Sequence, residues 1–129
     1  MLKRKKKRKY KTGSYVSVKS GKEYVYRSGW EGHYMKWLDM NPDVVEWSYE
    51  EIIIQYISNK KTRRVRKYIP DFSVSWKDGT KHLIEIKPSN KVNGITNQKK
   101  FKFAENWCLS NDHKFVILTE HELKGLGVM

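Results

Sequence analysis

Three residues near the middle of the chain have the types and the spacing needed to hydrolyse a phosphodiester bond. Asp71 lies in the segment YIPDF, Glu85 and Lys87 lie in HLIEIKP, and the turn-forming pair Asp78 and Gly79 separates the two segments. Two carboxylates can hold a divalent cation, which activates a bound water and neutralises a phosphate. A lysine beside them can orient or deprotonate that water and stabilise the charge that develops.

Strand alternation links these three side chains. In YIPDF the acid lies between Pro70 and Phe72, and in HLIEIKP the acid and the lysine alternate with two isoleucines. Successive side chains of a strand point to opposite faces, so the isoleucines enter the core and the charged residues leave it. If a hairpin closes at the DG turn, Asp71, Glu85 and Lys87 project toward one side of the sheet, and a one-residue slip would scatter them.

The predicted metal is Mg²⁺ or Mn²⁺, because both ions prefer hard oxygen ligands and keep several waters. We expect Asp71 and Glu85 to be ligands, with the Ile86 carbonyl as a third. Glu31, on a helix predicted before these strands, either adds a ligand to this metal or helps to bind a second.

Each of these residues also has a simpler interpretation. Glu31 follows Ser28 by three residues, which is the spacing of a capping box at a helix start. Asp71 is also compatible with an ordinary strand-end acid. Glu85 and Lys87 can form a solvated salt pair, which contributes little to stability.

The apolar pattern predicts the elements that must position these residues. A helix starts at Ser28, where Trp30, Tyr34, Trp37 and Leu38 form one apolar face, and it ends at Asn41–Pro42. We expect an extended segment over 44–50, strands over 52–57, 63–76, 81–87 and 115–118, a second helix over 96–110, and a short helix over 120–123. The order α, β, β, β, α, β predicts an α/β (α+β) fold, with a mixed sheet flanked by helices.

The net charge of +13 is concentrated at the N-terminus. Residues 1–11 hold eight of the 27 Lys and Arg and no acid, and without these eight charges the rest of the chain would have +5. We expect residues 1–24 to form a flexible basic arm, in which Tyr15 to Val18 is compatible with a short strand, and residues 25–129 to form one domain. A polyanion is the expected partner, since an amphipathic membrane helix would need more apolar residues than this arm offers.

Several features exclude other classes of protein. No apolar run reaches the roughly 18–20 residues of a membrane span, and no secretory signal is recognised. Cys108 is the single cysteine, so we expect a buried thiol and no internal disulfide. This cysteine content suits a protein of the reducing cytoplasm. The four histidines show no zinc-site spacing. We expect Glu50 and Glu51 to flank a strand, and both are weaker candidates to approach the site.

Nucleic-acid contacts are predicted at three groups of residues. The alternative to DNA contact is a solubilising tail for the N-terminal group, a basic edge strand that discourages aggregation for the group before PDF, and a solvated helix face for the group on the second helix. The predicted DNA-binding residues are Lys3, Arg4, Lys5, Lys6, Lys7, Arg8 and Lys9 in the arm, Arg63, Arg64, Arg66 and Lys67 before PDF, and Gln98 and Lys102 on the second helix.

The Pro70–Asp71 and Glu85–Ile86–Lys87 motifs resemble those of the PD-(D/E)XK nuclease superfamily. More narrowly, residues 26–88 resemble the head-completion nucleases of tailed phages, through YRSGWEGHYMKWLDMNPDVVEWSYEEIIIQY, RRVRKYIPDF and EIKP. The RS-x-x-E start and the PDF strand also resemble TnsA-type transposase endonucleases and the phage junction-resolving endonuclease I.

This resemblance implies a nuclease domain over 25–129 with a PD-(D/E)XK core, in which Glu31, Asp71, Glu85 and Lys87 are catalytic. It implies a Mg²⁺-dependent endonuclease that acts on double-stranded or branched DNA in the host cytoplasm. The implied biological step is the completion of packaged phage heads, with portal or head proteins as partners and association with the virion as a further option. The alternatives are a junction- or flap-cutting recombination nuclease, for which a dimer is expected, and a non-catalytic DNA-binding virion protein.

Overall fold

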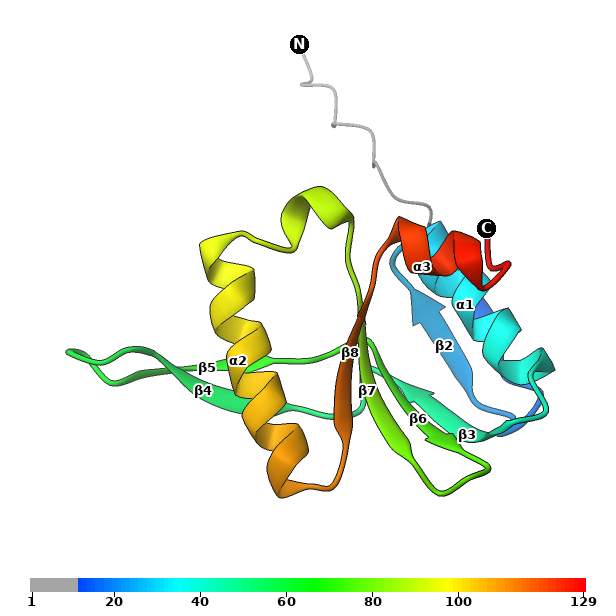
Figure 1. The fold of residues 1–129 in the computed structure, drawn as a ribbon, viewed down its shortest axis with the longest axis horizontal. Coiled ribbons are helices and arrows are strands. Elements are labelled where there is room, and N and C mark those ends of the chain that lie inside the picture. The colour runs from blue at the N-terminus through cyan, green and yellow to red at the C-terminus, as the bar shows by residue number, and fades with distance from the viewer. Residues whose placement is uncertain (1–11) are drawn as a thin grey trace, which may run out of the picture.

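A four-stranded mixed sheet lies between two layers in the computed structural model, which describes residues 12–129 (Figure 1). Helices α1 and α3 and the first hairpin cover one face of the sheet, and α2 covers the other. The elements are β1 (Gly13–Val16), β2 (Glu23–Tyr26), α1 (Gly29–Met40), β3 (Val44–Tyr49), β4 (Ile54–Asn59), β5 (Arg64–Tyr68), β6 (Phe72–Trp76), β7 (Lys81–Ile86), the 3-10 turn η1 (Ser89–Lys91), α2 (Ile95–Ser110), β8 (Lys114–Leu118) and α3 (Glu120–Gly125).

The central sheet has the strand order β3-β6-β7-β8. The first three strands are antiparallel neighbours, and β8 runs parallel to β7. A parallel pair needs a long connection, which α2 provides. Along the chain the central elements therefore follow as α1, β3, β6, β7, α2 and β8. This arrangement confirms the predicted order and the mixed sheet flanked by helices.

Both faces of β7 are buried, in two separate apolar clusters. Ile84 and Ile86 pack with α1 and α3 in the larger cluster, whereas Leu83 packs with α2 and the β4–β5 pair in the smaller one. The predicted alternation is therefore present. The face that holds Glu85 is covered by α2, however, and is not the solvated face that a simple salt pair would need.

The strand predicted over 63–76 is wrong in its continuity. Arg64–Tyr68 pairs with β4 in a separate two-stranded ribbon, and Phe72–Trp76 lies in the central sheet. The chain leaves the first ladder around Pro70, which has no N–H to donate to a continuing strand. The segment predicted over 52–57 is the ribbon strand Ile54–Asn59, so the first strand of the central sheet is instead Val44–Tyr49.

The turn between β6 and β7 has the predicted position. The Gly79 N–H donates to the Trp76 carbonyl at 3.0 Å, and the Trp76 N–H donates to the Thr80 carbonyl at 2.8 Å. Gly79 has a φ of 92°, in the left-handed region where glycine meets no Cβ penalty. This tight turn sets the β6–β7 register on which the position of the charged residues depends.

Asp39, near the end of α1, holds the first hairpin against the domain. Its carboxylate accepts hydrogen bonds from the Tyr15 and Ser17 hydroxyls, the Val18 N–H and the Trp47 indole, at 2.6 to 2.9 Å. Residues 13–26 therefore form a β-hairpin and not the arm expected over residues 1–24, and its first strand overlaps the short strand considered at Tyr15 to Val18. Residues 1–11 lie outside the described part of the chain.

Replacing Asp39 with alanine is expected to lower the free energy of unfolding by about 2–3 kcal/mol, because buried donors lose their acceptor. Ser17 is almost fully buried, so water cannot replace the lost bond there. Urea denaturation measures this change. Asp43→Ala is the matched control, since Asp43 is an exposed acid just beyond the same helix. Equal stabilities of the two variants would contradict the role of Asp39.

Asp39 also predicts a response to pH. Burial opposes its ionisation, but the hydrogen bonds from Tyr15, Trp47, Val18 and Ser17 outweigh burial and lower its pKa below the ordinary 3.8. Such a carboxylate stabilises the fold above its unfolded-state pKa, and this contribution is lost as the pH falls through the folded-state pKa. The stability gap between the wild type and Asp39→Ala should therefore narrow below about pH 4.

Candidate active site

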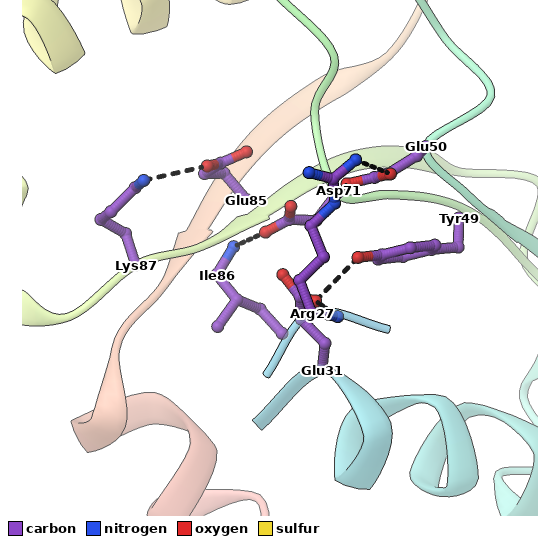
Figure 2. Close-up of polar contacts among 8 residues, drawn as sticks. All are labelled: Arg27, Glu31, Tyr49, Glu50, Asp71, Glu85, Ile86 and Lys87. Atoms are coloured by element: carbon purple, nitrogen blue, oxygen red, sulfur yellow. Dashed lines mark hydrogen bonds and ion pairs between the residues drawn. The ribbon is translucent and has the colours of Figure 1, made fainter. Parts of the chain in front are cut away.

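Two buried carboxylates lie where the central sheet begins, at the start of β6 and the end of β7 (Figure 2). Asp71 directly precedes β6, and its Oδ2 accepts a hydrogen bond from the Ile86 N–H at 2.8 Å. Glu85 is on β7, and its Oε1 accepts a hydrogen bond from the Tyr68 hydroxyl at 2.8 Å. Their exposed fractions are only 7% and 6%. The β6–β7 hairpin thus brings together the two acids that alternation predicted to be neighbours.

Lys87 completes this group from the residue after β7. Its Nζ lies 3.6 Å from Glu85 Oε2, and its side chain remains 27% exposed. Its N–H donates to the Leu118 carbonyl of β8, which fixes the backbone from which the side chain extends. The lysine is therefore anchored beside the carboxylates while its amine is accessible from solvent.

Glu31 reaches the same region from the first turn of α1. Its N–H donates to the Ser28 side chain, so Ser28 is the helix cap that the sequence predicted. Its carboxylate does not close the capping box, because Oε1 instead accepts from the Arg27 N–H at 2.8 Å and the Tyr49 hydroxyl at 2.7 Å. With an exposed fraction of 8%, Glu31 is aimed inward rather than along its own helix end.

Burial and the repulsion of nearby carboxylates both oppose ionisation of Asp71. Burial, followed by the nearby charges of Glu85 and Glu31, raises the pKa of Asp71 well above its ordinary value. Burial also raises the pKa of Glu85, although Tyr68 and Lys87 act in the opposite direction. Several negative charges with little access to water are unfavourable, and a bound cation would stabilise them. The charge of Lys87 compensates for only part of this repulsion.

The donor set suits a divalent hard cation. One oxygen of each acid accepts from a fixed donor, which leaves Asp71 Oδ1 and Glu31 Oε2 without a hydrogen bond in residues 12–129, while Glu85 Oε2 faces the Lys87 amine at 3.6 Å. No sealed side-chain N or O in this range lacks a partner, so these oxygens are reached by solvent. No preformed cage of three His, Cys, Asp or Glu side chains occurs there either. Two carboxylates plus waters are nevertheless a common Mg²⁺ set.

A cavity of about 650 Å³ opens beside these residues. Its walls include Glu31 and Ile86, together with Arg27, His33 and Lys87. Of the predicted catalytic residues, Glu31 and Lys87 therefore face a space large enough for a substrate, where Lys87 and Arg27 can meet a phosphate.

Arg27 and two tyrosines also belong to the site and were not predicted from the sequence, whereas Glu50 was one of the weaker candidates. Glu50 follows β3 with a φ of 55°, donates its N–H to the Asp71 carbonyl at 2.8 Å, and pairs through its carboxylate with Arg27 at 3.1 Å. A non-glycine residue in this backbone region is uncommon, and no sequence pattern signals it. Tyr49 and Tyr68 resemble ordinary strand residues, and only their hydroxyl contacts reveal their place at the site.

The predicted DNA-binding residues lie in different places. Arg64, Arg66 and Lys67 line a second cavity at the β4–β5 ribbon, and Arg63 lies at the ribbon turn with a φ of 56°. Gln98 and Lys102 are exposed on α2, where the Gln98 amide donates to the Val92 carbonyl at 2.7 Å, and neither lines a described cavity. The arm residues lie outside the described part.

Other candidates lie away from the site. Glu51 accepts a hydrogen bond from the Tyr24 hydroxyl and pairs with Lys22. Cys108, on the inner face of α2, is buried as predicted, and burial followed by the charge of Glu105 raises its pKa to about 11. Among residues 12–129, no helix has the length and apolarity to cross a membrane.

Two comparisons with known proteins agree with this geometry. A family model described as "TnsA-like endonuclease N terminal" matches residues 41–120. The head completion nuclease of Enterobacteria phage T4 is 31% identical over 128 aligned residues, and the match covers 82% of this chain and 85% of the relative. Both findings confirm the resemblance expected from the PDF and EIK segments.

Proposed function

This chain belongs to the TnsA-like endonuclease N-terminal family, and from that premise we propose that it is a metal-dependent DNA endonuclease that hydrolyses phosphodiester bonds. The observation that carries the proposal is the buried pair Asp71 and Glu85, with Lys87 beside it at an accessible cavity. The family supports a DNA-cleaving hydrolase, and the geometry supports the requirement for a cation.

Asp71 and Glu85 would hold Mg²⁺ or Mn²⁺, with the Ile86 carbonyl as a third ligand and Glu31 either adding a ligand or serving a second ion. Once bound, the ion lowers the pKa of a coordinated water and neutralises charge on the phosphate. The hydrogen bonds from the Ile86 N–H and the Tyr68 hydroxyl each occupy one carboxylate oxygen and direct the other toward solvent. This prior orientation reduces the reorganisation needed when substrate arrives.

Lys87 orients or deprotonates the attacking water and stabilises the charge that develops on the phosphate. The hydrogen bond from the Lys87 N–H to the Leu118 carbonyl holds the backbone in place, and the amine lies 3.6 Å from Glu85 Oε2. Because its side chain is partly exposed, Lys87 can also reach a substrate in the cavity. Arg27 and His33 lie in the same cavity wall and are positioned to contact the phosphate backbone.

The biological step proposed here is completion of DNA-filled phage heads, by analogy with the name of the phage T4 relative. The protein would then act in the host cytoplasm on DNA near the portal, with portal or other head proteins as partners. A recombination nuclease that cuts junctions or flaps would use the same chemistry and is the second candidate. The matching family model supports it as well, because that model is named for an endonuclease and not for a step of head assembly.

The test is a cleavage assay with supercoiled plasmid, linear duplex and branched DNA, with Mg²⁺, Mn²⁺ or EDTA. We expect cleavage with either metal and none with EDTA. Tight DNA binding by a protein inert with every divalent metal would leave only the non-catalytic virion protein. Strong preference for branched DNA by a dimer would favour the recombination nuclease over head completion.

Deletion of residues 1–11 is expected to weaken DNA binding and to reduce its salt dependence, because eight of the 27 Lys and Arg are removed. The slope of log K against log salt falls in magnitude by about 0.9 for every phosphate that the shortened protein no longer neutralises. Titrations from low to high salt measure this slope, and calorimetry with Mg²⁺ should show that metal binding is retained. An unchanged slope would remove the arm from the DNA-binding surface.

A further inference from the structure

A second cationic surface lies between the β4–β5 ribbon and α2. The ribbon passes along α2 and projects beyond it (Figure 1). A cavity of about 720 Å³ is lined by residues of the ribbon and of α2. We call this cavity the ribbon groove. Five basic residues and no acid line it: Arg64, Arg66, Lys67, Lys99 and Lys100.

Two contacts join the walls of the ribbon groove. Tyr56 of β4 packs on Phe103 of α2 with ring centroids 5.1 Å apart, which holds the ribbon against the helix. The Lys99 amine donates to the Ser58 carbonyl at 3.0 Å and joins the two elements at the solvent edge. Charges of one sign held at such a concave surface attract a polyanion.

Tyr68 links the groove to the candidate active site. The Lys100 amine lies 5.9 Å from the centroid of the Tyr68 ring, and the Tyr68 hydroxyl donates to Glu85 at 2.8 Å. Tyr68 is also the last residue of β5, so the ribbon starts at the carboxylates and extends away from them. A phosphodiester backbone bound in the groove would therefore lie close to the catalytic carboxylates.

We propose that the ribbon groove binds the phosphate backbone of the DNA substrate on one side of the cut, with Arg66, Lys99 and Lys100 as contacts. This inference rests on the proposed endonuclease function, and it adds Lys99 and Lys100 to the residues that the sequence predicted. DNA is favoured over an acidic protein segment because the groove lies close to the site of phosphodiester hydrolysis. A two-stranded ribbon also fits the major groove of DNA, so the projecting part can follow the duplex.

The test compares two triple variants that each remove three positive charges. The groove variant is Arg66→Gln/Lys99→Gln/Lys100→Gln, and the control is Lys36→Gln/Lys77→Gln/Lys81→Gln, whose residues are exposed on α1 and near the β6–β7 turn. DNA affinity is measured against salt in EDTA, so no cleavage occurs. We expect the groove variant to lose about two to three from the salt slope and about tenfold or more in affinity. The control should lose markedly less of both.

Equal slopes and affinities for the two variants would overturn the groove. A melting curve checks that each variant is folded. If the groove variant is not folded, Arg66→Gln alone replaces it, with an expected slope loss of about one. Failure of the wild type to cleave DNA with any metal would instead count against the proposed nuclease, while the groove comparison in EDTA would stand.

DNA with neutral methylphosphonates, scanned along either side of the cut, gives the position of the groove on the substrate. For the wild type, neutral linkages on one side should weaken binding, and the same linkages should have little further effect on the groove variant. Additive losses at every position would show that the substituted residues and the neutralised phosphates do not touch one another, and would also overturn the proposal.

Discussion

Asp71→Asn is expected to reduce DNA cleavage by at least about 10³-fold and to leave DNA binding in EDTA nearly unchanged. Asparagine has the same size, and its amide oxygen can still accept the hydrogen bond from the Ile86 N–H that Asp71 accepts at 2.8 Å. The substitution removes the negative charge that a divalent cation needs. Single-turnover cleavage with Mg²⁺ measures the loss.

The same variant is expected to be more stable than the wild type in metal-free buffer. Burial and the charges of Glu85 and Glu31 make the Asp71 carboxylate costly, as its raised pKa indicates. Relief of about 1 kcal/mol would raise the melting temperature by about 3–5 °C for a domain of this size. Asp112→Asn, in an exposed turn, is the control. Loss of cleavage accompanied by a lower melting temperature would point to a folding defect and contradict the proposed role of Asp71.

Addition of Mg²⁺ should reverse this order of stability. A ligand that binds only the folded state stabilises it by RT ln(1 + [L]/Kd), so the wild type gains stability and Asp71→Asn gains little. Equal gains for the two proteins would mean that the ion binds elsewhere.

Lys87→Gln is expected to reduce cleavage by about 10²–10⁴-fold, because the water loses the group that orients or deprotonates it. Since only one exposed charge is removed, DNA affinity should fall by much less. Lys91→Gln in η1 is the matched control, four residues further along the chain. Single-turnover rates at saturating protein separate the effect on chemistry from the effect on binding.

Lys87→Arg tests which property of the lysine matters. Arginine keeps the positive charge, but its planar guanidinium cannot donate from the same point or lose a proton at neutral pH. We therefore expect less than about a tenth of the wild-type rate. Full activity of Lys87→Arg would show that charge alone suffices, and would remove the proton-transfer role.

Local patterns predicted the part of the fold that holds the site. The YIPDF and HLIEIKP segments alternate around a DG turn, and that pattern determined the register that places Asp71 beside Glu85. The helix capped by Ser28 was likewise encoded within a few neighbouring residues. Periodicity and turn chemistry are short-range signals, so they can be recognised in one sequence.

What could not be predicted depends on contacts between distant segments. The β4–β5 ribbon contains the same β-branched and aromatic residues as a central strand, so apart from Pro70 its departure from the sheet has no local signature. The ordered hairpin at the N-terminus depends on Asp39, more than 20 residues away. The positions of Tyr49 and Tyr68 at the site depend in the same way on tertiary packing.

The departure of the ribbon from the sheet also has an evolutionary consequence. Its two strands leave side by side, with Ile54 paired to Tyr68 at the base. Residues inserted or deleted at the tip therefore need not move either end, and the entropic penalty of a longer loop rises only slowly with length. Selection can vary how such a protein engages different DNA shapes while the hydrolytic residues keep their geometry. Lineages of this family should accordingly differ most in length at residues 59–63.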